Sequence, residues 1–385
     1  MHPTGGASDR RLTVSWGIFF VLLFLYRSVF SVLGEVVVMR LTPISDTFLY
    51  QSGILEQTDF WANFGPHNLM TFGPSTLSTA LTAALGKALN IVFFGNAILI
   101  NIGFQTITFA GLVYLIMSIR PAERKYLAVL VLLPSFSVWT SIASKEAIVA
   151  GAVAVAAGYL IRLYTGSGRL RLIHVAAGTV IYIFKTQYLA ALAFFFLVTV
   201  IARRVRQSAA VATIIGAISL VALWFSSERL DELAQRVQTL LIINPGARST
   251  RTELFFTDPL DVILKAPVGM FRSFVGPTLA EVPTSVLHLI TFVESMVVVG
   301  FLLYLFLSRV KQLPAYNAIV GFFVLFWISF ATYPFGVMNA GSAIRYRSGW
   351  ILIVMVVFAT FLSREVYTHW KSGRSLRRPV VMKTQ

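Results

Sequence analysis

Long apolar stretches separated by short polar segments run through the sequence. A helix of about 20 apolar residues is long enough to cross a bilayer, and tilt widens that range. We predict a transmembrane helix over each of eight such stretches: 13–32, 91–119, 126–142, 147–163, 209–225, 286–307, 316–333 and 349–362. A further apolar stretch, from Leu172 to Ala202, is interrupted near Lys185. The pattern alone allows either one long helix there or a hairpin of two short ones.

The distribution of Lys and Arg decides between these two topologies. Cytoplasmic loops of membrane proteins are enriched in Lys and Arg. A hairpin with Lys185 at its outer tip gives ten spans, with 19 basic and only three acidic residues on the cytoplasmic side and 13 of each elsewhere. One long helix would instead place Arg203, Arg204 and Arg206 outside. We therefore predict an all-α, polytopic membrane protein with about ten transmembrane helices and both termini in the cytoplasm.

The composition agrees with this topology and accounts for the net charge. Of the 385 residues, 57% are hydrophobic and 12% charged, whereas a soluble domain has about 25% charged residues. The net charge of +16 falls on the predicted cytoplasmic side, which includes the basic tail 364–385. It therefore indicates orientation and not nucleic-acid binding. The absence of cysteine excludes disulfides, thiolate catalysis and cysteine-ligated zinc. We predict one transmembrane domain over residues 1–385.

Two long segments, about 33–90 and 226–285, lie on the predicted outer face. A Gly-Pro-Ser sequence at 73–75 opens a helix-like apolar run to Leu89, and apolar residues in 230–241 share one helical face. These patterns are typical of amphipathic helices that lie in the membrane interface. Because the inner loops are mostly short and basic, we look for chemistry on the outer face.

The first candidate site follows the first span. Asp46 and Tyr50 lie in a short polar patch, where Asp46 would serve as a general base if the membrane interface raises its pKa. The alternative interpretation is that Asp46 caps a helix in the loop.

The second candidate site is the junction of the third and fourth predicted spans. Pro134 breaks the helix and frees backbone carbonyls, which membrane depth tolerates only beside protein or water. Several hydroxyl groups, the indole of Trp139 and the charged pair Lys145 and Glu146 follow within a dozen residues. They indicate a polar, hydrated pocket, or else a snorkelling lysine beside a helix cap.

The third candidate site is the segment 339–347, which we predict to be an outer loop before the last span. Arg345 and Arg347 flank Tyr346 and follow a flexible Asn-Ala-Gly sequence. Two neighbouring guanidinium groups are suited to hold a phosphate or diphosphate. The alternative is contact with lipid headgroups.

Further charged residues could complete a cationic pocket for a phosphorylated lipid. They are Lys185 at the hairpin tip, Arg272 and Glu281 in the second outer segment, although each could equally be loop solvation. Glu294 lies inside a predicted span, where an unpaired acid is costly. Arg27 and Glu35 are a candidate ion pair near the first span. The histidines nearest the outer face, His67 and His288, are alternative bases without metal-ligand spacing, so we predict no metal site.

Three of these motifs together resemble bacterial membrane enzymes of glycan assembly. They are the acid after the first span, Pro-Ser-Phe-x-x-Trp-x-Ser with Ser-Lys-Glu at 134–146, and Asn-Ala-Gly-x-x-x-Arg-x-Arg at 339–347. Their layout over most of the chain is similar to that of Wzy-type polysaccharide polymerases and the wider GT-C glycosyltransferases. The resemblance implies an enzyme that uses polyprenyl-linked sugars at the outer face of the bacterial cytoplasmic membrane.

The resemblance also implies roles for the candidate residues. Arg345 and Arg347 would hold the phosphate, with help from Lys145, Lys185 or Arg272, and Asp46 would be the base. GT-C enzymes commonly carry two acids at this position, whereas Asp46 is followed by Thr47, which favours a metal-independent, polymerase-like enzyme without a cofactor. The implied partners are a polyprenyl-(di)phosphate-linked glycan, membrane lipids and other glycan-assembly proteins.

Three other functions remain open at this point. One is a GT-C transferase that moves a single sugar from a polyprenyl monophosphate. A second is a transporter or flippase of lipid-linked glycans, although the sequence lacks the paired halves that many transporters show. The third is a structural membrane subunit.

Overall fold

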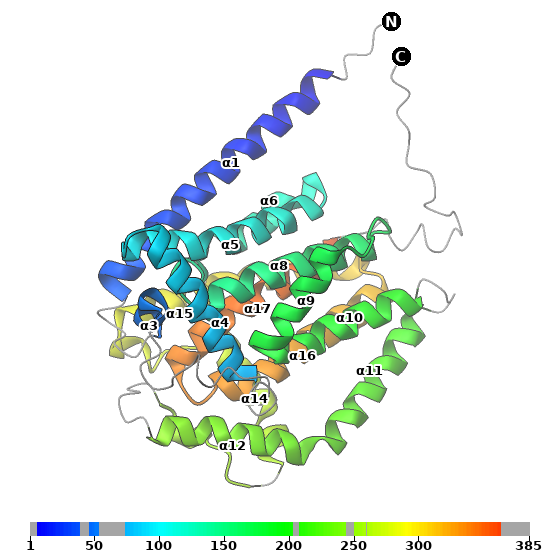
Figure 1. The fold of residues 1–385 in the computed structure, drawn as a ribbon. Helices are drawn as coiled ribbons and strands as arrows, with labels where there is room; N and C mark the ends of the chain where they lie inside the picture. Colours follow the sequence, from blue (N-terminus) through cyan, green and yellow to red (C-terminus); the bar gives the residue numbers. More distant parts are fainter. Residues whose placement is uncertain are drawn as a thin grey trace, which may run out of the picture.

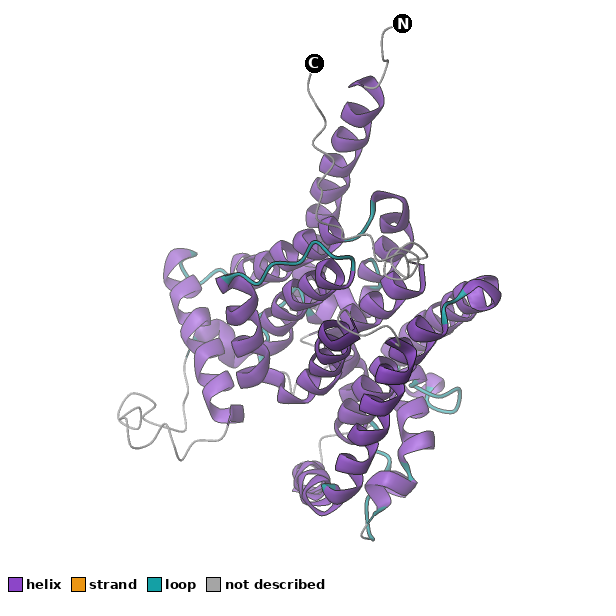
Figure 2. Cartoon of the chain, turned by 90° about the vertical axis from the view of Figure 1, so that its right-hand side faces the viewer, coloured by secondary structure: helices purple, strands orange, loops and turns teal. Residues whose placement is uncertain are grey.

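The computed structural model describes residues 6–38, 46–53, 74–202, 208–243, 250–258 and 260–362. These residues form helices and connecting loops without a β-strand (Figure 2). The main helices are α1 (Gly6–Leu33), α3 (Thr47–Ser52), α4 (Pro74–Val92), α5 (Ala97–Ser118), α6 (Pro121–Val131), α7 (Pro134–Trp139), α8 (Lys145–Tyr164), α9 (Leu172–Lys185), α10 (Leu189–Ala202), α11 (Ser208–Phe225), α12 (Ser227–Ile243), α13 (Asp261–Leu264), α14 (Ala266–Val275), α15 (Val286–Arg309), α16 (Ala315–Gly336) and α17 (Ala340–Leu362). The short helical turns are η1 (Gly34–Val38), η2 (Thr186–Tyr188), η3 (Thr252–Leu254), η4 (Val282–Thr284) and η5 (Val310–Gln312).

Seven helical segments among the described residues are long and apolar enough to cross a membrane, which confirms an all-α, polytopic membrane protein. They are Trp16–Val37, Ala97–Ser118, Lys145–Tyr164, Leu172–Ala202, Val286–Ser308, Ala315–Gly336 and Ala340–Thr360. The sequence predicted about ten spans, and the difference from these seven arises at three places. The stretch Leu172–Ala202 counts once here, α11 is shorter than the seven, and the predicted span 126–142 is not one helix.

The predicted third span is broken because it contains Pro134. Proline has no backbone N–H and its ring clashes with the preceding turn, so a helix cannot pass through it undisturbed. Helix α6 ends at Val131, α7 occupies one and a half turns after Pro134, and residues 140–144 are not helical. Helix α8 then begins at Lys145. This break, predicted from Pro134, positions the polar residues described below.

The stretch 172–202 turns back at Lys185, as predicted. The backbone of Lys185 leaves the helical region (φ −151°, ψ 66°), and Figure 1 shows α9 and α10 as the two limbs of a hairpin. At the start of α9, His174 stacks on Tyr159 near the C-terminal end of α8, with ring centroids 4.4 Å apart. Helix α9 therefore runs antiparallel to α8, and its tip lies beside the N-terminal end of α8.

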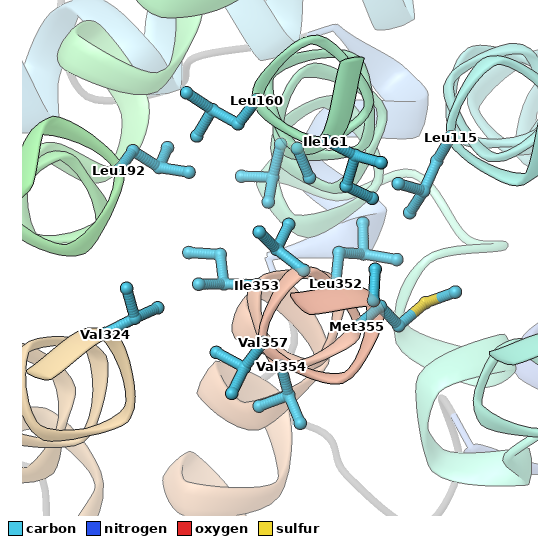
Figure 3. Packing of buried hydrophobic residues seen from close by; sticks show 14 of the residues in the cluster. Leu115, Leu160, Ile161, Leu192, Val324, Leu352, Ile353, Val354, Met355 and Val357 are labelled. Atoms are coloured by element: carbon cyan, nitrogen blue, oxygen red, sulfur yellow. The ribbon is translucent and has the colours of Figure 1, made fainter. Parts of the chain in front are cut away.

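Helix α17 occupies the centre of the bundle. Its apolar side chains, including Leu352, Ile353 and Met355, are almost fully buried. Figure 3 shows them surrounded by side chains from neighbouring helices: Leu115 of α5, Leu160 and Ile161 of α8, Leu192 of α10 and Val324 of α16. Because close packing on all sides leaves little freedom of movement, residues near the start of α17 rest on a rigid support.

Helices α5 and α8 approach each other unusually closely at a pair of glycines. A Cβ atom on Gly111 would lie 2.3 Å from the backbone oxygen of Gly151, and one on Gly151 would lie 2.7 Å from the backbone oxygen of Ile107. Small residues allow helix backbones to pack this tightly in membranes. The contact fixes α5 against α8, so side chains of α5 reach the break that precedes α8.

Candidate functional site

The two acids nearest the helix break lie on separate elements that meet at the N-terminal end of α8. Ser144 caps α8, its side chain accepting a hydrogen bond from the backbone N–H of Ala147. This start places Glu146 in the first turn, where its side chain is only 3% exposed. Asp46 precedes the short helix α3 and is 49% exposed. One acid is therefore buried in the bundle and the other faces the surface.

Arg345 of α17 connects these two acids. Its Nε lies 2.9 Å from Oε1 of Glu146, and its Nη2 lies 3.3 Å from Oδ2 of Asp46. The guanidinium carbon is 5.8 Å from the ring centroid of Trp139 at the end of α7. Elements far apart in the sequence thus converge on one arginine.

Two lysines complete this group. Lys185, at the hairpin tip, places Nζ 3.7 Å from Oε1 of Glu146 and 3.9 Å from the ring centroid of Tyr346. Lys145, the first residue of α8, donates a hydrogen bond of 2.6 Å to Oγ1 of Thr79 in α4. We call Asp46, Lys145, Glu146, Lys185 and Arg345 the charged cluster.

The charged cluster has three cationic and two anionic side chains, so its formal charge is positive when all five are ionised. Oε2 of Glu146 is buried and has no hydrogen-bond partner among the described residues. The Arg345 side chain is 25% exposed and contacts the half-exposed carboxylate of Asp46. The cluster is therefore open to an anionic ligand through Arg345 and Asp46, and closed around Glu146.

Tyr50 lies in α3, one turn after Asp46, and is almost fully buried. Burial, and then the negative charge of Asp46, raise the pKa of its phenol above the usual value. Tyr50 is therefore neutral at physiological pH and acts as a hydrogen-bonding group. Helix α3 is held directly against α4, because a Cβ atom on Gly86 would lie only 1.6 Å from the Tyr50 backbone oxygen.

The prediction of a loop over 339–347 is wrong, because α17 already begins at Ala340. Successive residues of an α-helix are rotated by about 100°, so Arg345 and Arg347 point about 200° apart and cannot grip one phosphate together. Arg347 is buried. Its Nη2 lies 3.4 Å from Oε2 of Glu294 and donates to Oγ of Ser135 at 3.2 Å, and its Nη1 donates to Ser295. It lies outside the charged cluster.

The charged residues in and beside the first and eighth predicted spans have partners that the sequence did not identify. Glu294 pairs with Arg347 and accepts a hydrogen bond of 2.8 Å from the Ser135 backbone. The predicted pair of Arg27 and Glu35 is wrong. Arg27 donates to the backbone oxygen of Thr140 at 2.7 Å, and Glu35 accepts from side chains of α3 and α5.

Arg272 and Glu281 also lie outside the charged cluster. Arg272 pairs with Glu253 at 3.4 Å near the surface. Glu281 accepts hydrogen bonds of 2.5 and 2.7 Å from Arg251. Arg251 in turn donates to the backbone oxygen of Val337 at 3.0 Å. These contacts tie the segment between α12 and α15 to the end of α16.

Of the alternative bases, His288 is buried beside the Glu281 backbone, and His67 lies outside the described residues.

We expect the Arg251–Glu281 pair to give the protein an acid-sensitive step in stability. Burial alone would raise the pKa of Glu281, but hydrogen bonds from Arg251 and the Thr278 backbone lower it to about 2. A pKa below its unfolded value of about 4.3 means that the pair stabilises the fold above that pH. The stabilisation is then lost as the pH falls from about 4 towards 2.

Thermal unfolding of the detergent-solubilised protein between about pH 7 and pH 2 measures this effect. Glu281→Gln should flatten the pH dependence. Glu253→Gln is the matched control, because Glu253 is in the more exposed pair with Arg272, and it should leave the pH dependence intact. Equal pH dependence in the parent and Glu281→Gln would contradict the assignment.

Sequence reasoning missed two buried polar residues of α5, of which Asn101 reaches the helix break and Gln105 contacts α1. Asn101 and Gln105 are fully buried in this candidate span. Asn101 accepts a hydrogen bond of 2.8 Å from the Ala143 backbone, and Gln105 accepts one of 2.9 Å from Ser31. The sequence did contain an indication of them, because side-chain amides within an apolar span are costly and usually have a specific partner.

The best-defined cavity among the described residues does not coincide with the charged cluster. This cavity of about 240 Å³ between α14 and α16 has a mainly apolar lining, including Leu264, Val268 and Tyr333, and none of the charged cluster. Among the described residues, no group of three His, Cys, Asp or Glu side chains could hold a metal ion. Comparison with known proteins found no matching family model, curated protein or solved structure.

Proposed function

We propose that the protein is a glycosyltransferase that joins polyprenyl-(di)phosphate-linked oligosaccharide units at the outer face of the bacterial cytoplasmic membrane. The observation that carries this proposal is the charged cluster. It brings Arg345, Lys185 and Lys145 together with two carboxylates at the N-terminal end of a long membrane helix. A helix N-terminus favours anions, and the additional cations favour a phosphate or diphosphate.

The reaction needs a base for the acceptor and cations for the leaving group. In the proposed step, the acceptor hydroxyl oxygen bonds to the anomeric carbon of the lipid-linked sugar. The bond from that carbon to the phosphate oxygen breaks, and its electron pair stays on the phosphate. The hydroxyl proton passes to Asp46. Arg345, with Lys145 and Lys185, stabilises the phosphate that leaves.

The unequal ion pairs of Arg345 support this division of roles. Its contact with buried Glu146 is short (2.9 Å), whereas its contact with exposed Asp46 is longer (3.3 Å). A phosphate that binds Arg345 competes with Asp46 and releases it to accept a proton, while Glu146 keeps the guanidinium in place. Because three cationic side chains already outnumber the two carboxylates, with Glu146 in contact with both Arg345 and Lys185, the arrangement favours cationic side chains over a metal ion as the phosphate partner.

Charge at the opposite end of the bundle supports the proposed orientation. Arg162 near the end of α8 donates a hydrogen bond to Ser118 at the end of α5. The adjacent connections carry Arg120, Arg169 and Arg171, and the first turn of α6 carries Arg124. Loops rich in Arg are cytoplasmic by the positive-inside rule. The charged cluster, at the other end of α8, then faces outward, and two termini in the cytoplasm fit the same arrangement. The tail 364–385 lies outside the described residues.

The proposal is tested by Asp46→Asn in cells that depend on the protein for their surface glycan. We expect single glycan units to accumulate on the lipid carrier and long chains to disappear, with transfer reduced by about 10²- to 10⁴-fold, the usual contribution of a general base. Asp258→Asn is the matched control, because Asp258 is an exposed loop acid outside the cluster. The measurement is the length distribution of the lipid-linked glycan at equal protein level.

Two outcomes would favour the alternatives. Loss of all glycan with a metal requirement in vitro would favour a GT-C transferase of single sugars. Movement of a labelled glycan lipid across the membrane without any change in its chain length would overturn the enzyme and favour a flippase.

A further inference from the structure

We propose that Asn101 of α5 is a positioning residue that keeps the two acids of the charged cluster, Asp46 and Glu146, at a fixed separation. Its side chain is fully buried. The amide oxygen accepts from the Ala143 backbone at 2.8 Å and from Gln51 Nε2 at 3.1 Å. The amide nitrogen donates to Oε2 of Glu35 at 3.1 Å and to the backbone oxygen of Ser31 at 3.4 Å. These four contacts use the full hydrogen-bonding capacity of an asparagine.

The contact with Ala143 controls where α8 begins. Residues 140–144 are not helical, so their backbone groups need partners from other elements. Arg27 and Thr108 donate to the backbone oxygen of Thr140, at 2.7 and 3.1 Å. Ser31 donates to the backbone oxygen of Ser141 at 2.8 Å. Asn101 binds the last of these groups before the Ser144 cap, three residues from Glu146. It therefore fixes the point from which Glu146 projects.

The contact with Gln51 controls the position of α3. Gln51 Nε2 also donates to Oε2 of Glu35 at 2.6 Å, and the backbone oxygen of Gln51 accepts from Asn90 of α4 at 2.9 Å. Asp46 lies at the start of this six-residue helix, so a shift at Gln51 moves Asp46 as well. Through one amide, Asn101 connects the element carrying Asp46 to the element carrying Glu146.

A leucine at position 101 has a similar size but none of these hydrogen bonds. The Ala143 N–H would lose its partner, and α3 and the helix break would lose their common contact. The separation between the two acids, and hence the placement of Arg345 between them, would then no longer be fixed. Misplacement of a catalytic group by about 1 Å can reduce the rate of a reaction by about 100-fold. A small shift of either acid is therefore sufficient to impair the charged cluster.

The natural absence of cysteine allows a direct test of this geometry. Spin labels are placed at Phe48→Cys on α3 and Tyr182→Cys on α9, both exposed, and their distance distribution is measured by pulsed electron resonance. We expect Asn101→Leu to shift or broaden the distribution. Asn317→Leu is the matched control, because Asn317 is equally buried but bonds Tyr164 and the Thr360 backbone at the other end of the bundle. It should leave the distribution unchanged.

A second variant covers the case in which Asn101→Leu does not fold. Gln51→Leu removes the side-chain contacts of α3 with Asn101 and Glu35 but keeps the partner of Ala143, and it should also displace the label at position 48. Unchanged distributions in the foldable variants, or equal changes in Asn317→Leu, would overturn the positioning role.

A binding measurement connects the geometry to the charged cluster, and this part rests on the proposed phosphate-binding function. Inorganic pyrophosphate is the probe, and its affinity should fall by about tenfold or more in Asn101→Leu and less than about twofold in Asn317→Leu. If the parent protein does not bind pyrophosphate, the phosphate-binding part of the proposed function fails, and the label distances still decide the role of Asn101.

Discussion

Replacing Arg345 with alanine is expected to reduce glycan transfer by about 10²- to 10³-fold, the usual loss when one charge-stabilising donor is removed from an active site. Arg345 contacts both carboxylates of the charged cluster and is more exposed than Lys185, at 25% against 11%. Its loss removes the group that would stabilise the leaving phosphate. The measurement is the initial rate of transfer from a lipid-linked donor by the purified protein.

Two further variants make this prediction specific. Arg345→Lys keeps the charge but loses the planar group that reaches Glu146 and Asp46 together, so it should restore only part of the rate. Arg272→Ala removes a cation that pairs with Glu253 near the surface and should retain most of the rate. An equal loss in Arg345→Ala and Arg272→Ala would contradict the special position of Arg345.

Three members of the charged cluster, Lys145, Glu146 and Lys185, could be predicted as candidates from the sequence because they interrupt or border apolar stretches. Lys185 breaks the apolar stretch Leu172–Ala202, and Lys145 and Glu146 follow a proline-broken segment. Charged residues in such places need a partner or a polar surrounding, which singles them out as candidates. Their mutual contacts could not be predicted, because α3, α8, α9 and α17 are brought together only by the packing of the bundle.

The start of the last span could not be predicted because hydropathy does not recognise compensated charges. Arg345 and Arg347 make residues 340–348 look like a loop, yet this segment is helical and largely buried. Arg347 is accommodated there because Glu294, on another helix, supplies the opposite charge. The two arginines therefore have the same sequence signature but different environments, and only the helical geometry separates them.

Asn101 illustrates a second limit of sequence reasoning. One amide in a long apolar helix predicts a polar contact, but it does not identify the partner. The partners of Asn101 come from the first span, from α3 and from the helix break, which are up to 70 residues away along the chain. Such a network follows from the close approach of α5 to α8 at Gly111 and Gly151, which the apolar pattern does not reveal.

Replacing Arg347 with methionine is expected to destabilise the fold by about 3–5 kcal/mol, the usual cost of breaking a buried ion pair. Glu294 would remain buried, with the Ser135 backbone as its hydrogen-bond donor and without its cation. Arg345→Ala should cost less, because Glu146 keeps Lys185 at 3.7 Å. Unfolding of the detergent-solubilised variants, measured under identical conditions, gives the comparison.

The double variant Arg347→Met with Glu294→Gln decides between a structural and a catalytic role for Arg347. Removing both charges eliminates the unpaired carboxylate, so the double variant should recover much of the stability lost in the single one. Because Arg347 lies outside the charged cluster, transfer per folded molecule should also remain within about tenfold of the parent, since the lost contact supports packing and not the charge that develops in the reaction. If the double variant is stable but transfers no glycan, Arg347 acts in the reaction, and the separation of the two arginines proposed above is wrong.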